Sequence, residues 1–330
     1  MMSSATPFKS KVLVLFINFV IVICREHSSF VSFPSSTLLA RVTESNANTN
    51  GYPSLQKLDA KLVFNEDEEC LAGISSEDID QKLRISIDNL YANFLDPDGD
   101  LVDYKGLRKS EEFKEYKKQA AELKNFDISV LEDKARKAFF LNIYNALVIH
   151  GLVQMGEPKS WDDRLVLYSS ASYIIGGKVL SLDDIEHGIL RGNTVGGSHN
   201  SIPFAEGDDR RSLVLDLDPR IHFALNCGAI SCPPIRFYEA DDIDDQLDIS
   251  TEAYLEDIQI EELTQTVRLP KILEWYQSDF TGPSPESPVA ILEWVLPFVY
   301  EEEKRARLQK IVQSGNVNIE YLPYNWDLNE

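Results

Sequence analysis

Cysteine and histidine are scarce in this sequence of 330 residues, which holds four of the first and five of the second. Four cysteines are too few for a disulfide-rich scaffold, and only Cys227 and Cys232 are close enough in sequence to suggest a site. No Asn-x-Ser/Thr acceptor occurs, which is weak evidence against long residence in a glycosylating compartment. A Cys-x-x-Cys motif is absent as well, and this disfavours redox shuttling.

Basic side chains are also under-represented, because 32 Lys and Arg stand against 54 Asp and Glu, for a formal net charge of -22. The acidic residues are spread along the chain, so its surface repels phosphate backbones and nucleic-acid binding is not expected. The hydrophobic content of 43% is ordinary for a globular protein, and the length allows one large core or two modest ones.

The N-terminal apolar run, residues 12–24, has about 13 residues, whereas a membrane-spanning helix needs roughly 20. Because Lys9 and Lys11 precede it, residues 1–24 resemble a secretory signal, and residues 25–75 are interpreted as targeting or linker sequence. We therefore expect the secretory pathway or secretion. The Ser/Phe-rich stretch behind the signal resembles the bipartite targeting sequence of algae with complex plastids, so a plastid is the alternative. No membrane contact is expected beyond an uncleaved signal anchor.

Regular structure is expected from about residue 76, as one globular domain over 76–330. Apolar residues at helical spacing predict an amphipathic helix over 78–94. The DPDGD sequence at 96–100 predicts a turn and not a calcium loop, since its glycine is misplaced for an EF-hand. Ser110 is expected to cap the charged helix that follows. The apolar stripe of the first helix consists of Leu83, Ile87, Leu90 and Phe94.

A helix that is apolar on nearly every side is predicted next. Ser129 and Glu132 form a capping-box pattern at its start, and the stretch from Ala138 to Val153 has no polar face. Such a helix must be the central one of the fold.

Three polar residues interrupt this central helix. Asn142 and Asn145 lie about 60° apart on it, and burying both amides costs roughly 1–3 kcal/mol each unless they are hydrogen-bonded. They are therefore either structural pins or site groups. His150 is interpreted as a core histidine with satisfied hydrogen bonds, although it stays a candidate base.

A hairpin and a short helix are expected after the central helix. Gly176 and Gly177 join two β-rich runs, and a tight primed turn needs positive φ at both positions. Ser181 with Asp184 is a capping signature for a short helix over 182–190.

That short helix and its end carry Glu186, His187 and Arg191. The simplest interpretation is a surface ion pair between Glu186 and Arg191, and the alternative is a histidine held beside a carboxylate, ready to act as a base. The Gly/Ser/Asp-rich segment 192–211 predicts a mobile loop of roughly 20 residues, which is typical of a lid beside a site.

Pro219 is predicted to begin a strand, because the residues after it alternate strictly between apolar and polar. The apolar face would consist of Ile221, Phe223 and Leu225, and the opposite face of Arg220, His222, Ala224 and Asn226. A strand face with Arg, His and Asn is not a core face, so it would line solvent or a pocket. The same alternation would put Cys227 opposite His222 unless the chain turns at Gly228.

The two cysteines need chemical partners if they are reactive, since an unperturbed cysteine has a pKa of about 8.5. His187 or His150, arriving from another element, is the more natural base for Cys227. Cys232 precedes Pro233, which forces it into an extended conformation. A thiol fixed in this way suits catalysis, and equally suits a disulfide bridge to Cys227.

Four stretches carry most of these features: AFFLNIYNALVIHG at 138–151, LSLDDIEHGILRG at 180–192, DPRIHFALNCGAISCPP at 218–234 and YLPYNWDLN at 321–329. In this order they resemble the signature blocks of the domain-of-unknown-function 547 family. The resemblance is specific over about 134–255 and absent before about 75. The activity of that family is not established, but its Cys- and His-bearing blocks are similar in character to thiol hydrolases of the papain and transglutaminase kind.

The rest of the sequence predicts a helix over 241–258, a short strand at 266–270, two further helices and a final strand. The expected fold class is α/β in the α+β sense, a mainly helical domain with a small mixed or antiparallel sheet around the buried central helix. The resemblance implies a papain- or transglutaminase-like fold. Five aromatic residues are expected in the core and its rim instead of a ligand box: Trp275, Trp294, Trp326, Tyr276 and Tyr324.

Two functions compete on this sequence. In the first, the domain is a thiol-dependent hydrolase or acyl transferase acting on a small molecule or a peptide. The candidate nucleophiles and bases are Cys227, Cys232, His187 and His222. The residues that would bind the substrate or stabilise an oxyanion are Arg220, Asn226, Asn142, Asn145, Glu186 and Arg191.

In the second, it is a non-catalytic interaction domain whose cysteines are bridged or simply buried. Metal binding through His222, Cys227 and Cys232 is disfavoured, because their spacing matches none of the usual zinc patterns. No cofactor is expected.

Overall fold

The chain is seen in a computed structural model that describes residues 61–66, 74–195, 201–283, 287 and 289–330. The expected signal-like segment 1–24 lies outside the described residues, as do residues 25–60 and 67–73 of the expected linker, and there both stay predictions. Residues 61–66 of that linker are described and contribute strand β1 (Leu62–Val63) to a sheet, so this part belongs to the fold.

The fold is organised by the long helix α5 (Asp133–Met155), in which every residue from Ala138 to Val153 is buried. The predicted central helix is thus confirmed, and its apolar side chains belong to the main hydrophobic core. In the described part of the chain α5 alone is long and apolar enough to cross a bilayer, but the protein itself covers most of that stretch.

The start of α5 differs from the prediction. Ser129 lies in a short 3-10 turn, η2 (Ile128–Val130), where its hydroxyl donates to Asp127 Oδ1 over 2.6 Å. The helix begins only after Glu132 and has no side-chain cap. The capping box is absent because Ser129 hydrogen-bonds to Asp127 in a local turn, and this turn replaces the helix cap.

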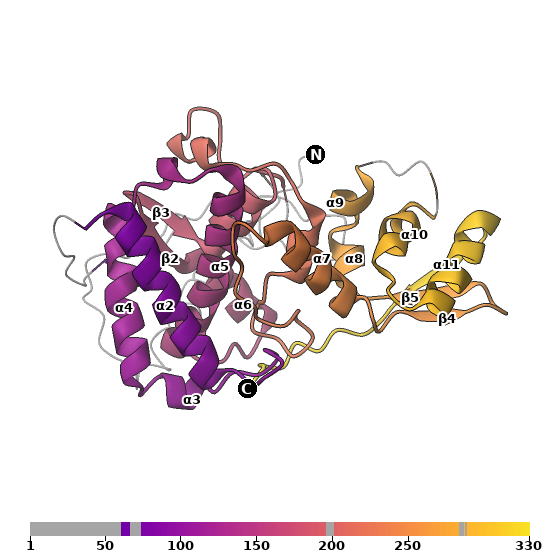
Figure 1. The fold of residues 1–330 in the computed structure, drawn as a ribbon, viewed down its shortest axis with the longest axis horizontal. Coiled ribbons are helices and arrows are strands. Elements are labelled where there is room, and N and C mark those ends of the chain that lie inside the picture. The colour runs from indigo at the N-terminus through magenta and orange to yellow at the C-terminus, as the bar shows by residue number, and fades with distance from the viewer. Residues whose placement is uncertain (1–60, 67–73, 196–200, 284–286, 288) are drawn as a thin grey trace, which may run out of the picture. The chain divides into compact units, whose positions relative to one another are not determined.

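Two helices beside α5 follow the sequence pattern. Helix α2 (Ser76–Phe94) contains the predicted helix and buries most of its apolar stripe. Ser110 caps α4 (Glu111–Glu122) by accepting from Phe113 N over 3.0 Å, and α4 lies alongside α2 (Figure 1). The other helices are α3 (Tyr104–Leu107), α6 (Trp161–Ser170), α7 (Ile243–Tyr254), α8 (Ile272–Trp275), α9 (Gln277–Thr281), α10 (Ala290–Val295) and α11 (Glu302–Ser314).

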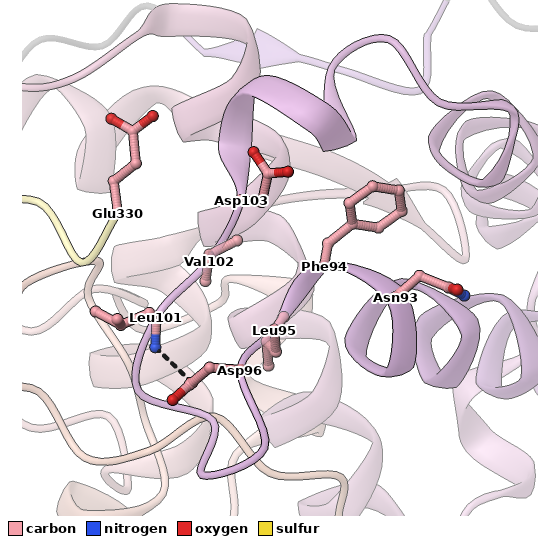
Figure 2. A pocket seen from close by; sticks show the side chains of 8 residues that line it. All are labelled: Asn93, Phe94, Leu95, Asp96, Leu101, Val102, Asp103 and Glu330. Carbon is pink, nitrogen blue, oxygen red and sulfur yellow. Dashed lines mark hydrogen bonds between the residues drawn. The ribbon is translucent and has the colours of Figure 1, made fainter.

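The predicted turn at 96–100 is present, closed by a bridge between Leu95 and Val102. Asp96 Oδ1 accepts from Leu101 N over 2.8 Å (Figure 2). Figure 2 draws a pocket at this turn, and none of the residues predicted for the functional site lines it.

The first sheet has the order β1-β2-β3, with β1 (Leu62–Val63) parallel to β2 (Ala171–Ile175) and β2 antiparallel to β3 (Lys178–Ser181). The predicted hairpin is confirmed, since β2 and β3 are joined by Gly176 and Gly177 with φ of 56° and 76°.

The second sheet has the order β4-β5-β6 and is also mixed. Its strand β4 (Gln259–Glu261) runs antiparallel to β5 (Thr266–Leu269), which runs parallel to β6 (Asn318–Tyr321). A second hydrophobic core lies among these C-terminal elements. The expected mainly helical α+β class is therefore confirmed, with two small sheets where the sequence predicted one.

The short helix after the hairpin is a π-helix, η3 (Asp184–Leu190). Its predicted capping box is confirmed, because Ser181 N donates to Asp184 Oδ2 over 3.0 Å and Asp184 N to Ser181 Oγ over 3.2 Å. Every residue of η3 is buried, so the interpretation of Glu186 and Arg191 as a surface ion pair is wrong.

The strand predicted to begin at Pro219 is wrong. Residues Pro219–Phe223 form a 3-10 turn, η5, because proline suits the first turn of a helix and Asp218 caps that turn by accepting from Arg220 N over 3.2 Å. Both Ile221 and His222 are buried in it. The alternation in the sequence therefore does not separate a core face from a pocket face.

The loop predicted at 192–211 is described at both ends, while its residues 196–200 lie outside the described residues. Asn193 forms two hydrogen bonds of 2.9 Å with the backbone of Phe204. Phe204 is fully buried against Gly188, where an added Cβ would lie 2.4 Å from the ring. These parts of the loop are packed onto η3, and a lid movement stays a prediction.

The variants Gly176→Ala and Gly177→Ala distinguish backbone strain from steric overlap in the hairpin turn. Both residues have positive φ, so backbone strain alone should lower the free energy of unfolding by about 1 kcal/mol in either variant. At Gly176 the added Cβ also comes within 2.7 Å of Phe126 O, whereas at Gly177 it meets nothing within 4 Å. We expect Gly176→Ala to cost roughly 2–4 kcal/mol in urea unfolding. Equal losses in the two variants would contradict this packing.

Candidate functional site

Two asparagines of α5 fasten passing chain segments to the central helix. Asn142 donates to Tyr238 O over 2.8 Å and accepts from Tyr238 N over 2.9 Å. Asn145 donates to Ala224 O and accepts from Asn226 N, both over 2.9 Å. Both amides are therefore structural pins, which is one of the two roles that the sequence left open.

Asn226 extends this attachment to residues 227–232, here named the thiol loop. Its Nδ2 donates to Pro233 O over 2.7 Å, and its Oδ1 accepts from Gly228 N over 2.8 Å. One side chain thus holds both ends of the thiol loop, and Gly228 turns the chain there with φ of 78°. An amide engaged in this way is not presented to a substrate, so the geometry gives no support to a substrate-binding role for Asn226.

The two sulfurs of the thiol loop face each other. Both cysteines are free, and their Sγ atoms are 2.7 Å apart. Cys232 is buried, whereas Cys227 is partly exposed. The backbone N–H groups of Cys227 and Ala229 donate to Cys232 Sγ, over 3.1 and 3.4 Å. Cys227 is therefore the less buried residue of the pair.

The closing segment 324–329 completes the thiol loop from the far end of the chain. It pairs with the loop through an antiparallel bridge and backbone hydrogen bonds. This pairing places Tyr324 Oη 3.1 Å from Cys232 Sγ and 3.6 Å from Cys227 Sγ. A phenol hydroxyl therefore contacts both sulfurs.

Helix α6 holds the backbone of the thiol loop. Arg164 Nη1 and Tyr168 Oη donate to Cys227 O over 3.3 and 3.2 Å, and Arg164 Nη2 donates to Trp326 O. The Arg164 guanidinium also lies over the Trp326 ring, 5.2 Å from its centroid. The rings that pack against Trp326 are those of Trp161, Trp275 and Tyr324. These partly buried aromatic residues form a rim around the loop, as the sequence predicted for three of them.

The electrostatic surroundings make the two thiols unequal. The hydrogen bond with Cys232 lowers the pKa of the Cys227 thiol to about 7, with help from Tyr324 and Arg164, although burial opposes the shift. Burial, followed by the hydrogen bond with Cys227, raises the pKa of Cys232 well above its usual range. Near neutral pH Cys227 is therefore the thiol of the pair that ionises.

A second group of polar side chains is buried among η3, η5 and α9. This buried ionic network consists of Glu186, His187, Arg191, His222 and Asp279, each at most 8% exposed. Arg191 donates to both carboxylate oxygens of Asp279, over 2.7 and 2.9 Å. His222 Nε2 lies 2.8 Å from Asp279 Oδ2. Asp279 is thus the centre of the network.

The hydrogen bonds determine where the protons of this network sit. Arg191 can only donate, so His187 Nδ1, 2.8 Å from Arg191 Nη1, accepts and carries no proton. Burial lowers the pKa of His222, so its neutral ring donates from Nε2 to Asp279. Burial acts to raise the pKa of Asp279, but the hydrogen bonds from His222 and Arg191 hold it well below its usual range.

Two tyrosines hold Glu186 at the edge of this network. Tyr144 Oη donates to Glu186 Oε2 over 2.9 Å, and Tyr276 Oη donates to Glu186 Oε1 over 2.8 Å. Tyr276 also stacks on His222, with ring centroids 3.8 Å apart. Three causes raise the pKa of both tyrosines: burial is the largest, the charge of Glu186 is next, and the charge of Cys227 is weaker. The thiol loop and the buried ionic network are therefore electrostatic neighbours.

Each of the two sulfurs hydrogen-bonds to the other and to Tyr324, and Cys232 Sγ also accepts from backbone N–H groups. A hydrogen bond from Tyr168 helps to lower the pKa of Cys227. His150 bonds to Tyr173 Oη over 2.7 Å, which confirms the interpretation as a core histidine, and burial lowers its pKa to about 3. The expected convergence of a thiol and an imidazole stays a prediction.

Arg220 is directed away from the sulfurs as well. It donates to Asp218, Asp244 and Asp248 over 2.7 to 3.0 Å and so ties η5 to α7. In the part of the chain that the structure describes, no three His, Cys, Asp or Glu side chains come together as potential metal ligands.

Residues 128–255 match the model of a family described as "Protein of unknown function, DUF547". The chain carries a DUF547 domain. The resemblance is thereby confirmed for the three blocks between 138 and 234, with bounds close to those expected, whereas the block at 321–329 lies outside the match. No curated protein and no solved structure matches the chain.

The site reaches beyond the DUF547 match. The matched region contains α5, η3, η5 and the thiol loop, but Tyr276, Asp279 and Tyr324 follow residue 255. The C-terminal elements therefore complete both the thiol loop and the buried ionic network.

Three polar side chains of the site were missed by sequence reasoning. Asp279 lies between Tyr276 and Phe280 on one apolar helix face, and a carboxylate in such a place signals a buried ion pair. Arg164 belongs to α6, a helix that the sequence patterns did not indicate. Tyr324 lies in the closing family block but was assigned to the core and rim.

Removing the amide of Asn145 should destabilise the DUF547 domain. Asn145→Ala leaves the buried Ala224 C=O and Asn226 N–H without their partner, so we expect a loss of roughly 2–5 kcal/mol in the free energy of unfolding. The matched control is Asn93→Ala on the exposed surface of α2, which should change it by less than about 0.5 kcal/mol. A comparable loss in both variants would mean that the hydrogen bonds of Asn145 contribute nothing to the free energy of unfolding.

Neutralising Asp279 should have a pH-dependent cost. Asp279→Asn removes the charge that pairs with Arg191 and accepts a hydrogen bond from His222, so we expect it to lower the free energy of unfolding by roughly 3–5 kcal/mol at pH 7. Because the pKa of Asp279 is depressed in the folded state, this stability is present above the unfolded value of about 3.9 and is lost as the pH falls further. Urea unfolding between pH 7 and pH 2 measures the difference in the free energy of unfolding between the wild type and Asp279→Asn, with exposed Asp88→Asn as control. A difference that does not shrink in acid contradicts the assignment of Asp279 as a buried, ionised carboxylate.

Proposed function

We propose that the DUF547 domain acts through covalent chemistry at Cys227, as a thiol-dependent acyl transferase or hydrolase. The observation that carries the proposal is the pairing of a partly exposed Cys227 with a buried Cys232 that hydrogen-bonds to it. Cys227 is assigned as the nucleophile because it is the less buried residue of the pair. The lesser burial and the lowered pKa belong to the same residue, as a reactive thiol requires.

The chemistry is transfer of an acyl group onto sulfur. The Cys227 thiolate attacks the carbonyl carbon of the acyl donor, a new C–S bond forms, and the bond to the leaving group breaks. Water then attacks the thioester on Cys227, which releases the carboxylic acid and restores the thiol. An amine or a thiol in place of water gives acyl transfer.

The surroundings of the sulfur favour a thioester as the acyl donor. An amine leaving group has to be protonated as it departs, and an imidazole usually supplies that proton. The sulfurs hydrogen-bond to each other and to Tyr324, while His187 Nδ1 and His222 Nε2 are engaged within the buried ionic network. A thiolate leaves without such help, so thioesters, and not amides, fit this site.

The roles predicted for the other residues change accordingly. Cys232 and Tyr324 stabilise the Cys227 thiolate by hydrogen bonds, which replaces activation by a histidine. Asn142, Asn145 and Asn226 position the loop, and Glu186, Arg191 and Asp279 position the neighbouring elements.

Alkylation of the full chain with iodoacetamide, followed by peptide mapping across a pH series, tests the nucleophile. The rate at Cys227 should rise with pH about a midpoint near 7, because the thiolate is the reactive form. The groups that face the sulfur are Cys232, Tyr324, Tyr168, Arg164, Tyr104 and Tyr254. In Cys232→Ala the midpoint should move toward the ordinary value of about 8.5, so alkylation at pH 6 should slow by roughly tenfold or more.

An acyl thioester of N-acetylcysteamine supplies the second readout. Intact-mass analysis should find one acyl group on Cys227 in the wild type and none in Cys227→Ser. Should Cys227 alkylate with an ordinary thiol midpoint and take up no acyl group, the proposal fails and a non-catalytic interaction domain remains.

A further inference from the structure

We propose that Cys227 and Cys232 form a thiol–disulfide exchange couple, in which Cys227 attacks a disulfide substrate and Cys232 resolves the mixed disulfide. This activity rests on the proposed nucleophilic role of Cys227 and adds a second class of substrate to the same sulfur.

The first support is the geometry of the two sulfurs. Their separation of 2.7 Å is about 0.65 Å longer than a covalent S–S bond of about 2.05 Å, so a small shift of the two side chains is enough to form the bond. The loop is held at both ends by Asn226 and along its length by the closing segment 324–329. The sulfurs are therefore positioned by the fold, not by chance encounters of a flexible loop.

The second support is the difference in access. Cys227 is partly exposed, whereas Cys232 is buried and receives N–H groups from Cys227 and Ala229. An incoming disulfide meets the less buried Cys227 first, and the resulting mixed disulfide lies next to Cys232. This is the division between attacking and resolving thiols that exchange requires. It also offsets the missing Cys-x-x-Cys motif, because the turn at Gly228 brings residues five apart into contact.

The steps balance as an exchange of two electrons and two protons. The Cys227 thiolate attacks one sulfur of the disulfide RSSR, a Cys227–S–S–R bond forms, and RS⁻ leaves and takes a proton from water. Cys232 then gives its proton to solvent and attacks Cys227 Sγ, so that the second RS⁻ leaves. The substrate is reduced to two thiols, and the Cys227–Cys232 pair is oxidised to a disulfide.

Tyr324 is a positioning residue for this second step. Its hydroxyl lies 3.1 Å from Cys232 Sγ and can donate a hydrogen bond to that sulfur as it ionises. Burial otherwise disfavours the Cys232 thiolate. Loss of the hydroxyl should therefore slow resolution more than it slows the first attack.

The test uses the reduced full chain and bis(2-hydroxyethyl) disulfide, without oxygen and with a chelator present. We expect the wild type to release two equivalents of mercaptoethanol and to form the Cys227–Cys232 disulfide, seen by mass spectrometry after alkylation. Cys232→Ala should release one equivalent and stop at the mixed disulfide on Cys227. Cys227→Ala should release none. In Tyr324→Phe the lifetime of the mixed disulfide should be at least several times longer than in the wild type.

Two outcomes separate this inference from the proposed function. If wild-type Cys227 alkylates with a midpoint near pH 7 and accepts an acyl group, but its mixed disulfide persists unresolved, only the exchange couple is refuted. If Cys227 forms neither adduct, the proposed function fails as well. Cys232→Ser is the control for a folding defect in Cys232→Ala, and both variants are compared with the wild type by circular dichroism and by the same release assay. A folded variant that still releases two equivalents of mercaptoethanol would overturn the resolving role of Cys232.

Discussion

The positions of both sulfurs depend on the burial of one amide, that of Asn145. An amide inside a protein needs hydrogen bonds for its oxygen and its NH₂ group, because leaving either without a partner costs free energy. In α5 these partners are Ala224 O and Asn226 N, so the chain after η5 must pass against the central helix at a fixed register. Asn226 then transmits the constraint to the thiol loop. The geometry of the cysteines is therefore a consequence of helix packing.

A buried carboxylate imposes a second constraint of the same kind. Asp279 can stay ionised in the interior only because Arg191 and His222 supply hydrogen bonds and charge, and these side chains come from three different elements. The turn η5 lies where the two hydrophobic cores meet, since Ile221 belongs to one and its neighbour Phe223 to the other. The ionic network thus joins the C-terminal elements to the family core.

The thiols and the imidazoles of the expected Cys–His pair lie in two separate groups of polar residues. His222 hydrogen-bonds to Asp279 in the buried ionic network, while the sulfurs hydrogen-bond to each other and to Tyr324. In the proposed function, the partners of the reacting thiol are another thiol and a phenol instead of an imidazolium. Both proposals therefore use leaving groups that depart as anions, a property that thioesters and disulfides share.

By itself the sequence determined the features that local physics controls. The apolar run of α5, the stripe of α2, the Ser110 cap and the Gly176-Gly177 turn each follow from side-chain periodicity or backbone freedom within a few residues. The sequence also brought together the cysteines, histidines and asparagines of the candidate site. It failed at η5, because the alternation that suggests a strand was overridden by the cap at Asp218 and the proline after it. Only the tertiary structure decided which groups meet: Asp279 with Arg191 and Tyr324 with the thiols are contacts between segments about 90 residues apart, and such pairs are chosen by packing and by the need to satisfy buried charge, which no local pattern records.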